Sequence, residues 1–339
     1  MSVPTLERRP THKALPLLRS EISRITHRRL FRVLVLILLG GIVFISTIVF
    51  FVHSKQAGTT QEQLQSNQAE QQRYWLQCAD SAPTPDKVGR FCGAEPASQP
   101  LQSFDWGQDD RYKAYEALPF SLIGAAIASA GVAFLIGASS GGAEWSSRSM
   151  TMQLLFEPRR LRLLTVKWLG LLLCTALLAL VAMAITVGFG ALTAQLRGTW
   201  DQQLAPIDEL RDNLAQTMAL MGLRGLVLVA AAATIGYAIA MLVRNTGASL
   251  GAAFVYFAVV ENGIRFVFMR HGSEPFMLST NAVAFLFPGG LDVPGKEVGP
   301  YSEVTSVNLT NLRSFVTLMA YTALLSLPAA WSFTRRDVG

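Results

Sequence analysis

Two pairs of residues in this sequence have types and spacings that could do chemistry. Cys78 and Cys92 flank a short polar segment that is rich in turn residues. In an oxidising compartment two such thiols can form a disulfide, and the alternative is a pair of free thiols. Glu261 and Arg265 lie four residues apart in an apolar run, so on a helix they share one face and can form an ion pair.

Motifs for catalysis and nucleotide binding are missing from the sequence. It contains no G-x-x-x-x-G-K-[ST] segment that would cradle a phosphate, and no His/Cys spacing typical of a metal site. It also lacks a Ser-His-Asp grouping and paired carboxylates inside the apolar runs. We therefore expect no enzymatic activity and neither a cofactor nor a metal in this chain.

The apolar residues are gathered into runs long enough to cross a membrane. The chain is 51% hydrophobic and 15% charged, whereas soluble domains carry about 25% charged residues. About 20 apolar residues are needed to cross roughly 30 Å of hydrocarbon as a helix. The sequence therefore predicts an all-α membrane protein with six transmembrane helices, at about 30–52, 117–138, 168–193, 217–243, 247–269 and 314–334.

The distribution of basic residues predicts the orientation of these helices. If both termini and the connections 138–167 and 244–246 face the cytoplasm, the cytoplasmic parts hold 16 of the 29 Lys and Arg residues but five of the 23 acidic ones. This is the bias that bacterial inner-membrane proteins show. The basic residues flank membrane spans, so the net charge of +6 does not indicate nucleic-acid binding.

The segments outside the predicted spans differ in character. Residues 1–29 form a cytoplasmic arm, in which 14–29 have the pattern of a basic amphipathic helix lying in the membrane interface. The alternative is a solvated extension of the first span. Residues 53–116 form a long external loop, with a helix predicted over 61–77. In the external loop 270–313, residues 276–290 are apolar but too short to cross, which favours a re-entrant segment or a helix lying flat outside.

The connection 138–167 is longer than two neighbouring membrane helices need. It is polar and basic, and it can hold a helix at the cytoplasmic membrane surface. Its first half contains Glu144, Trp145, Arg148, Ser149, Leu154 and Leu155, and its second half contains Pro158 and the basic cluster Arg159, Arg160, Arg162 and Lys167.

With this connection, the six spans and the amphipathic arm containing Glu21, residues 30–339 resemble the transmembrane domain of ABC-2 permeases, a type V exporter-like class. Members of that family carry an acidic-aromatic pair, a Gly-Thr, a leucine-rich stretch, a proline, a basic cluster and a lysine that opens the third span. This sequence matches them with Glu144 and Trp145, Leu154 and Leu155, Pro158, Arg159 and Arg160, and Lys167. It departs from them at Arg148, which stands where the family often has the glycine, and at Ser149, which stands in place of the threonine.

The resemblance implies a subunit of an exporter in the bacterial cell membrane. Two copies of a separate ABC ATPase, which bind ATP and Mg²⁺, would dock beneath two permeases, either two copies of this chain or this chain and a sister. The coupling helix around residues 144–155 would contact the ATPase through its charged side chains. Alternatively, these charges, and the arginines after Pro158 in particular, anchor the connection to anionic membrane lipids.

Two questions of function remain open at the level of sequence. The Glu261–Arg265 pair can be a polar spot on the translocation route or a self-satisfied pair near the outer interface, because Glu261 lies about 21 Å from the cytoplasmic turn. The chain as a whole can be an exporter permease. The rival is a non-transporting membrane scaffold or sensor whose extracellular loop binds a ligand.

Overall fold

The computed structural model describes residues 14–54, 61–81, 88, 92, 94–99, 111–146, 149–156, 159–268, 272–298 and 303–335. Six helices in these ranges are long and apolar enough to cross a membrane, which confirms the predicted number. They are α2 (Arg29–Val52), α5 (Ala114–Ser146), α7 (Arg160–Arg197), α9 (Leu214–Val243), the continuous helix Thr246–Val267, and α13 (Asn311–Arg335). The chain is thus a helical protein of the multi-pass membrane type.

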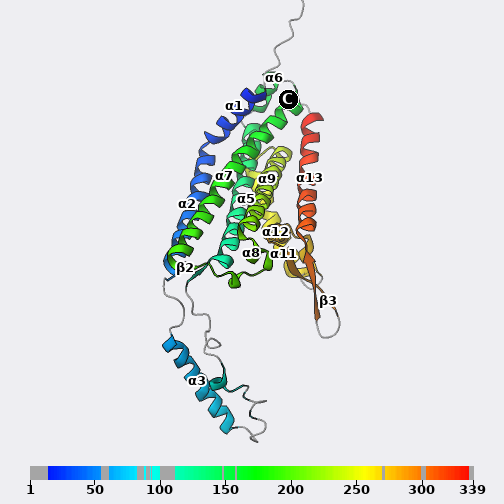
Figure 1. Cartoon of the computed structure of the whole chain (residues 1–339). Helices are drawn as coiled ribbons and strands as arrows, with labels where there is room; N and C mark the ends of the chain where they lie inside the picture. Colours follow the sequence, from blue (N-terminus) through cyan, green and yellow to red (C-terminus); the bar gives the residue numbers. More distant parts are fainter. Residues whose placement is uncertain are drawn as a thin grey trace, which may run out of the picture.

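The six helices run side by side, and their connections gather at two ends (Figure 1). One end carries α1 (Ala14–Thr26), α6 (Ser149–Phe156) and the last turn of α13. The other end carries α8 (Asp208–Asp212) and a β-hairpin. The first and the last described residues therefore lie at the same end of the bundle, as an even number of crossings requires.

Small residues let α5 and α9 pack closely at the centre of the bundle. A Cβ atom on Gly137 would overlap the carbonyl oxygen of Ala233, and one on Gly236 would overlap that of Phe134. Ala133 and Val229 are fully buried or nearly so in the same core. Such close backbone approach is typical of membrane helices. The small-residue face of the second span thus packs inside the chain.

The expected connection 138–167 is mostly helical, which corrects its predicted boundaries. Helix α5 continues to Ser146 and α7 already begins at Arg160. Gly141 and Gly142 suggest a flexible segment in the sequence, but they lie buried in α5. A Cβ atom on Gly142 would overlap Thr246 at the start of α10 (Thr246–Val255). Tight packing against the α9–α10 turn therefore stabilises a helix where local sequence favours a loop.

The fifth span is not a regular α-helix. It starts as α10, passes through the π-helical turn η5 (Tyr256–Glu261) and ends as α11 (Asn262–Phe268). π-helical turns are rare in proteins, and those that occur are frequently found at functional sites. The sequence predicts the length of this span but gives no sign of the π-turn.

At the end that carries α8, the structure contains more than the sequence predicts. The helix expected over 61–77 is confirmed as α3 (Gln61–Asp80), which packs on the short helix η2 (Pro96–Ser98). Gln68 Nε2 donates to the Pro96 carbonyl at 2.9 Å, and a disulfide joins Cys78 to Cys92, the expected pair. The short pieces η4 (Gln202–Leu204), β1 (Tyr112–Lys113) and β2 (Gly198–Thr199) complete this end near α5 and α7.

The connection before α13 folds into η6 (Glu274–Phe276), α12 (Leu278–Leu286) and a hairpin. Strands β3 (Leu291–Val298) and β4 (Glu303–Leu309) pair antiparallel, with a register irregularity after Pro294. The sequence analysis misses this hairpin. Helix α12 packs on α13, α9 and α5, and Asn281 within it is fully buried, so α12 belongs to the bundle and does not lie flat outside it.

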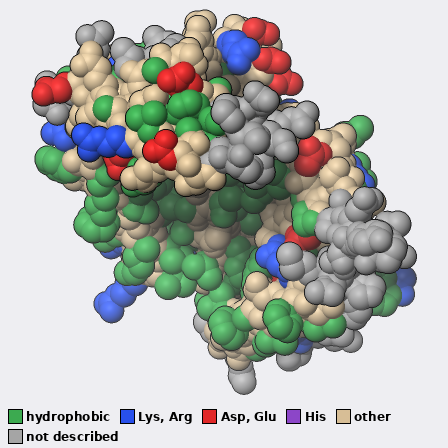
Figure 2. All heavy atoms as spheres, turned by 90° about the horizontal axis from the view of Figure 1, so that it is seen from below, with side chains coloured by type: hydrophobic (Ala, Val, Ile, Leu, Met, Phe, Trp, Pro, Cys, Tyr) green, Lys and Arg blue, Asp and Glu red, His purple; other side chains and the backbone are tan. Residues whose placement is uncertain are grey.

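Large apolar side chains cover the outer faces of several spans. On α2, Leu36, Phe44 and Phe51 are each about two-thirds exposed or more. From the end that carries the hairpin, hydrophobic side chains form a band across a hollowed region between polar and charged side chains (Figure 2). Apolar exposure of this extent is expected of a surface that faces lipid or a partner helix.

Candidate functional site

Four charged residues, three of them buried, form an ion cluster at the end of the bundle that carries α1 and α6. Lys167 Nζ lies 2.9 Å from one oxygen of Glu144 and 3.3 Å from both oxygens of Glu21. The exposed fractions of Lys167, Glu144 and Glu21 are 4%, 4% and 6%. Arg28 completes the cluster by donating to Glu144 Oε1 at 3.3 Å. The ion cluster is Glu21, Arg28, Glu144 and Lys167.

The charges of the ion cluster balance. Two carboxylates face one ammonium and one guanidinium, and Arg28 also donates to the carbonyls of Ser139 and Ser140 at 3.3 Å. Arg24, at the exposed rim, pairs with Glu21 at 3.1 Å. A buried ion pair contributes little net stability, but removing one partner leaves an uncompensated charge. The cluster therefore fixes how its elements sit against one another.

The ion cluster joins three elements that are distant in sequence. Glu21 lies on α1, and Arg28 directly precedes α2. Glu144 lies in the last turns of α5, and Lys167 lies in the second turn of α7. Helix α1 lies along α7, where a Cβ atom on Gly170 would stand 3.3 Å from Glu21 Cβ. The absence of a side chain at Gly170 thus lets α1 approach closely enough for the ion pairs.

Trp145 connects this end of α5 to α9 and α13. Its Nε1–H donates to Met241 Sδ at 3.2 Å, and the guanidinium of Arg244 stacks over its ring at 4.2 Å. The ring edge meets Phe333 of α13 at a centroid distance of 6.5 Å. Arg244 has φ 58°, so it ends α9 in the left-handed conformation that a Gly would adopt more readily. Its stacking on Trp145 compensates for that conformation.

Between α5 and α7, the short helix α6 has one buried and one exposed side. Met150 is fully buried, whereas Met152 is 61% exposed. Ser149 Oγ donates to the carbonyl of Glu144 at 3.4 Å. Arg148 lies outside the described residues, and Leu154 and Leu155 are described only as part of α6.

The structure corrects the expected exposure of the charged residues in this region. Glu144 was expected to meet an ATPase surface, but it lies inside the ion cluster. Lys167 was expected in a basic cluster at the membrane surface, but it is buried beside Glu144. Arg160 donates to the carbonyls of Phe333 and Thr334 and so caps the end of α13. Arg159 is exposed and Arg162 is half-buried.

The expected Glu261–Arg265 pair is also wrong. Arg265 Nε lies 2.8 Å from Glu274 Oε1, and its Nη2 donates to Ser279 and Thr280. Glu261 instead accepts a hydrogen bond from the backbone N–H of Ser279 at 2.7 Å. Spacing along the helix permits the local pair, but polar groups from η6 and α12 displace it.

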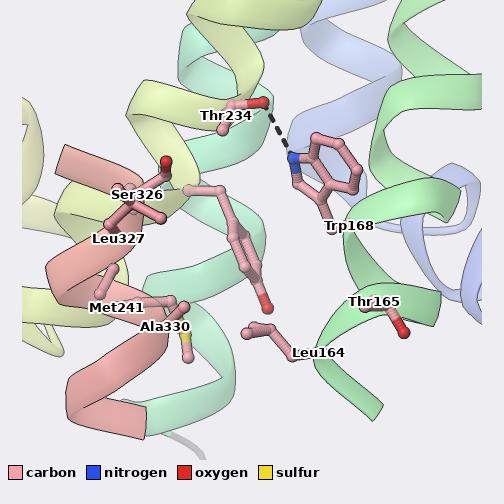
Figure 3. A pocket seen from close by; sticks show the side chains of 11 residues that line it. Leu164, Thr165, Trp168, Thr234, Met241, Ser326, Leu327 and Ala330 are labelled. Atoms are coloured by element: carbon pink, nitrogen blue, oxygen red, sulfur yellow. Dashed lines mark hydrogen bonds between the residues drawn. The ribbon is translucent and has the colours of Figure 1, made fainter. Parts of the chain in front are cut away.

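Two cavities open among the helices. The larger, of about 680 Å³, is enclosed by α5, α9, the fifth span, α12 and α13. The smaller, of about 220 Å³, lies between α7, α9 and α13 (Figure 3). There Trp168 Nε1–H donates to Thr234 Oγ1 at 2.9 Å. Within the described residues, no group of three or more His, Cys, Asp or Glu side chains could hold a metal ion.

The sequence contains a signal for the ion cluster that the sequence analysis did not use. Glu21 follows Leu18 by three residues and precedes Ile25 by four, so it falls on the apolar side of its helix. Lys167 falls in the same way between Leu163 and Leu171. A charged residue on an apolar face indicates a buried partner, although the sequence does not say which one.

No protein-family model matches the chain, and no curated protein matches it.

Proposed function

We propose that this chain is the membrane-spanning permease subunit of an ABC exporter of the ABC-2 type. In this proposal the end with α1 and α6 faces the cytoplasm of a bacterial cell, and the six spans form part of the translocation path. ATP and Mg²⁺ bind to two copies of a separate ATPase subunit, and a second permease, identical or a sister, completes the path within the lipid bilayer.

One observation carries the proposal: α6 is a short helix held between two long spans whose ends are locked together. The ion cluster ties α5 to α7 and to α1, while Trp145 ties α5 to α9 and α13. A displacement applied to α6 is therefore transmitted to several spans at once, because packed and ion-paired elements move together. This is the mechanical property that a subunit driven by an external ATPase needs.

The contact with the ATPase is assigned to the exposed side of α6. The apolar side chain of Met152 is exposed and so contributes little to the packing of the bundle. Arg159, seven residues later in the sequence, is also exposed. Apolar anchors surrounded by polar groups are typical of protein interfaces. The buried Glu144 acts in this scheme by holding the end of α5 in place.

The test is assembly with an ATPase. The tagged chain is purified from its native membranes, any co-purifying subunit with a phosphate-binding loop is identified, and the pair is then co-expressed. We expect Met152→Glu to abolish the association and the stimulation of ATP hydrolysis. The matched control is Leu312→Glu, which makes the same kind of change at a 72% exposed residue at the other end of the bundle.

The proposal is wrong if no such ATPase associates with the chain, or if both variants assemble and hydrolyse ATP as the original does. A ligand that binds to the disulfide-closed segment around α3 would then favour the rival function, a membrane scaffold or sensor.

A further inference from the structure

The carboxylate of Glu261 is buried in the fifth span without a cationic partner among the described residues. The residue is 2% exposed and ends the π-helical turn η5. Its Oε1 accepts the backbone N–H of Ser279 at 2.7 Å, while its Oε2 has no hydrogen-bond partner within the described part of the chain. One of the two oxygens of this carboxylate therefore has no partner there.

The nearest arginine on the same helix does not compensate for this charge. Arg265 is engaged by Glu274, at 2.8 Å and 3.4 Å, and Glu274 also accepts from Thr280 at 2.7 Å. Glu261, Arg265 and Glu274 thus carry two potential negative charges and one positive charge. A buried carboxylate without a cation is costly, and within a membrane such groups usually face water or a transported species.

Glu261 does not itself line the larger cavity, but two of its neighbours do. Ser279, whose N–H binds Glu261, lines the cavity, and so does Tyr256 at the first position of the same π-turn. The remaining lining is almost entirely apolar, with Phe134, Leu228 and Leu325 as examples. Its volume of about 680 Å³ lies in the range of sites that hold drug-sized ligands.

We propose that this cavity binds a hydrophobic amine, with the hydrocarbon part in the apolar space and the ammonium on Glu261 Oε2. The inference deepens the proposed function by naming a substrate class, and it rests on that function only for the subsequent transport. A metal ion fits the region less well, because cations such as Mg²⁺ and Ca²⁺ require several oxygen ligands and the cavity offers carbon.

Binding is measured on the purified chain in phosphatidylcholine nanodiscs, without any ATPase. The probe is radiolabelled dodecylamine, which is protonated at pH 7 as a lysine side chain is. Its neutral match is radiolabelled 1-dodecanol, and empty nanodiscs give the background. We expect Glu261→Gln to weaken binding of the amine about ten- to hundredfold, as the loss of a charge-assisted hydrogen bond does, and to leave binding of the alcohol unchanged.

A second pair of variants tests the cavity itself. Gly131 lines the cavity and Gly124 does not, although both lie on α5 and an added Cβ atom would meet nothing within 4 Å at either position. Gly131→Phe is expected to weaken binding of both probes at least about tenfold, because the ring occupies the space of the hydrocarbon. Gly124→Phe is expected to weaken neither.

Several outcomes would overturn the inference. They are equal affinity of the original chain for amine and alcohol above background, an unchanged affinity of Glu261→Gln for the amine, or equal effects of the two phenylalanine variants. If Glu261→Gln fails to insert into the membrane, the inference is tested by the ratio of the original chain's affinities for amine and alcohol and by the two phenylalanine variants. Because no ATPase takes part, a failure of binding here is distinct from a failure of ATPase coupling.

Discussion

Lys167 is the residue on which the ion cluster depends most. Its ammonium is the only cationic group within 3.3 Å of both Glu21 and Glu144 among the described residues, and it is almost fully buried. Arg28 reaches Glu144 alone, and Arg24 reaches Glu21 from the exposed rim. Without Lys167, two carboxylates would share a buried site with insufficient positive charge.

We predict that Lys167→Met destabilises the chain by about 3–5 kcal/mol, the cost of leaving buried charges without a partner. The measurement is the thermal unfolding temperature of the purified protein in detergent. Arg159→Met is the matched control, because Arg159 is exposed and its loss leaves the ion cluster intact. Equal unfolding temperatures for the two variants would contradict the prediction.

At this scale the sequence predicts which residues matter better than it predicts their partners. Glu144 and Lys167 stand out in the connection, but each was expected at a surface. Their pairing joins residues 23 positions apart, and the pairing of Lys167 with Glu21 joins residues 146 positions apart. The four-residue spacing that favours a Glu261–Arg265 pair takes no account of Glu274 and Ser279, which reach the site from other elements.

Helix α1 is the element whose position depends on a single missing side chain. The space above Gly170 holds Glu21, Leu18 and the backbone of Ile22, all within 4 Å of an added Cβ atom. The apolar residue Ile25 enters the core on the same side of α1. Apolar packing and ion pairing therefore both hold α1 on α7.

We predict that Gly170→Leu separates α1 from α7 without unfolding the bundle, because the larger side chain occupies the place of Glu21 and Leu18. Amide hydrogen exchange over residues 14–26 is expected to accelerate at least about tenfold, as for a locally opening element. Gly188→Leu is the matched control, since Gly188 lies on the same helix and an added Cβ atom there meets nothing within 4 Å. Similar exchange in both variants would refute the role of Gly170.

The elements are predictable where a long apolar run decides their structure. All six spans follow from hydropathy, since a run of about 20 apolar residues has few alternatives in a membrane. The end of α5 is different, because its glycines and serines favour a loop and only packing against Thr246 makes a helix of it. The hairpin likewise depends on hydrogen bonds between β3 and β4, and the prolines and glycines in its sequence do not favour strands.

As a whole, the molecule has two chemically different ends. One end holds the ion cluster, α6 and both described ends of the chain, while the other holds α3, the hairpin and the disulfide. In the function proposed above, the basic bias in the sequence places the first end in the cytoplasm. A disulfide at the second end agrees with this proposal, since disulfides persist on the oxidising side of a membrane.

We predict that the Cys78–Cys92 bond forms in the cell and stabilises the α3 segment without affecting the bundle. It closes a loop of about 15 residues, worth about 3 kcal/mol in the chain-entropy model. Protein purified without reductant is digested and analysed by mass spectrometry, in a background with Cys174→Ala to remove the free, buried cysteine. Reduction is expected to speed proteolysis within 61–99 and to leave the rate of cleavage in the membrane-spanning helices unchanged. Free thiols at both positions would contradict both the bond and the proposed orientation.

The unequal lengths of the helices have a consequence for the lipid around them. Helix α7 has 38 residues and so measures about 57 Å, while α2 has 24 residues and measures about 36 Å. Helix α2, the 22-residue fifth span and the 25-residue α13 come nearest to a hydrocarbon layer of about 30 Å, and α7 must extend well beyond it. A thicker or thinner bilayer therefore strains the short helices first and tilts them against α5 and α7. Acyl-chain length thereby acts on the fifth span, where Glu261 lies, before it acts on the longer helices α5, α7 and α9.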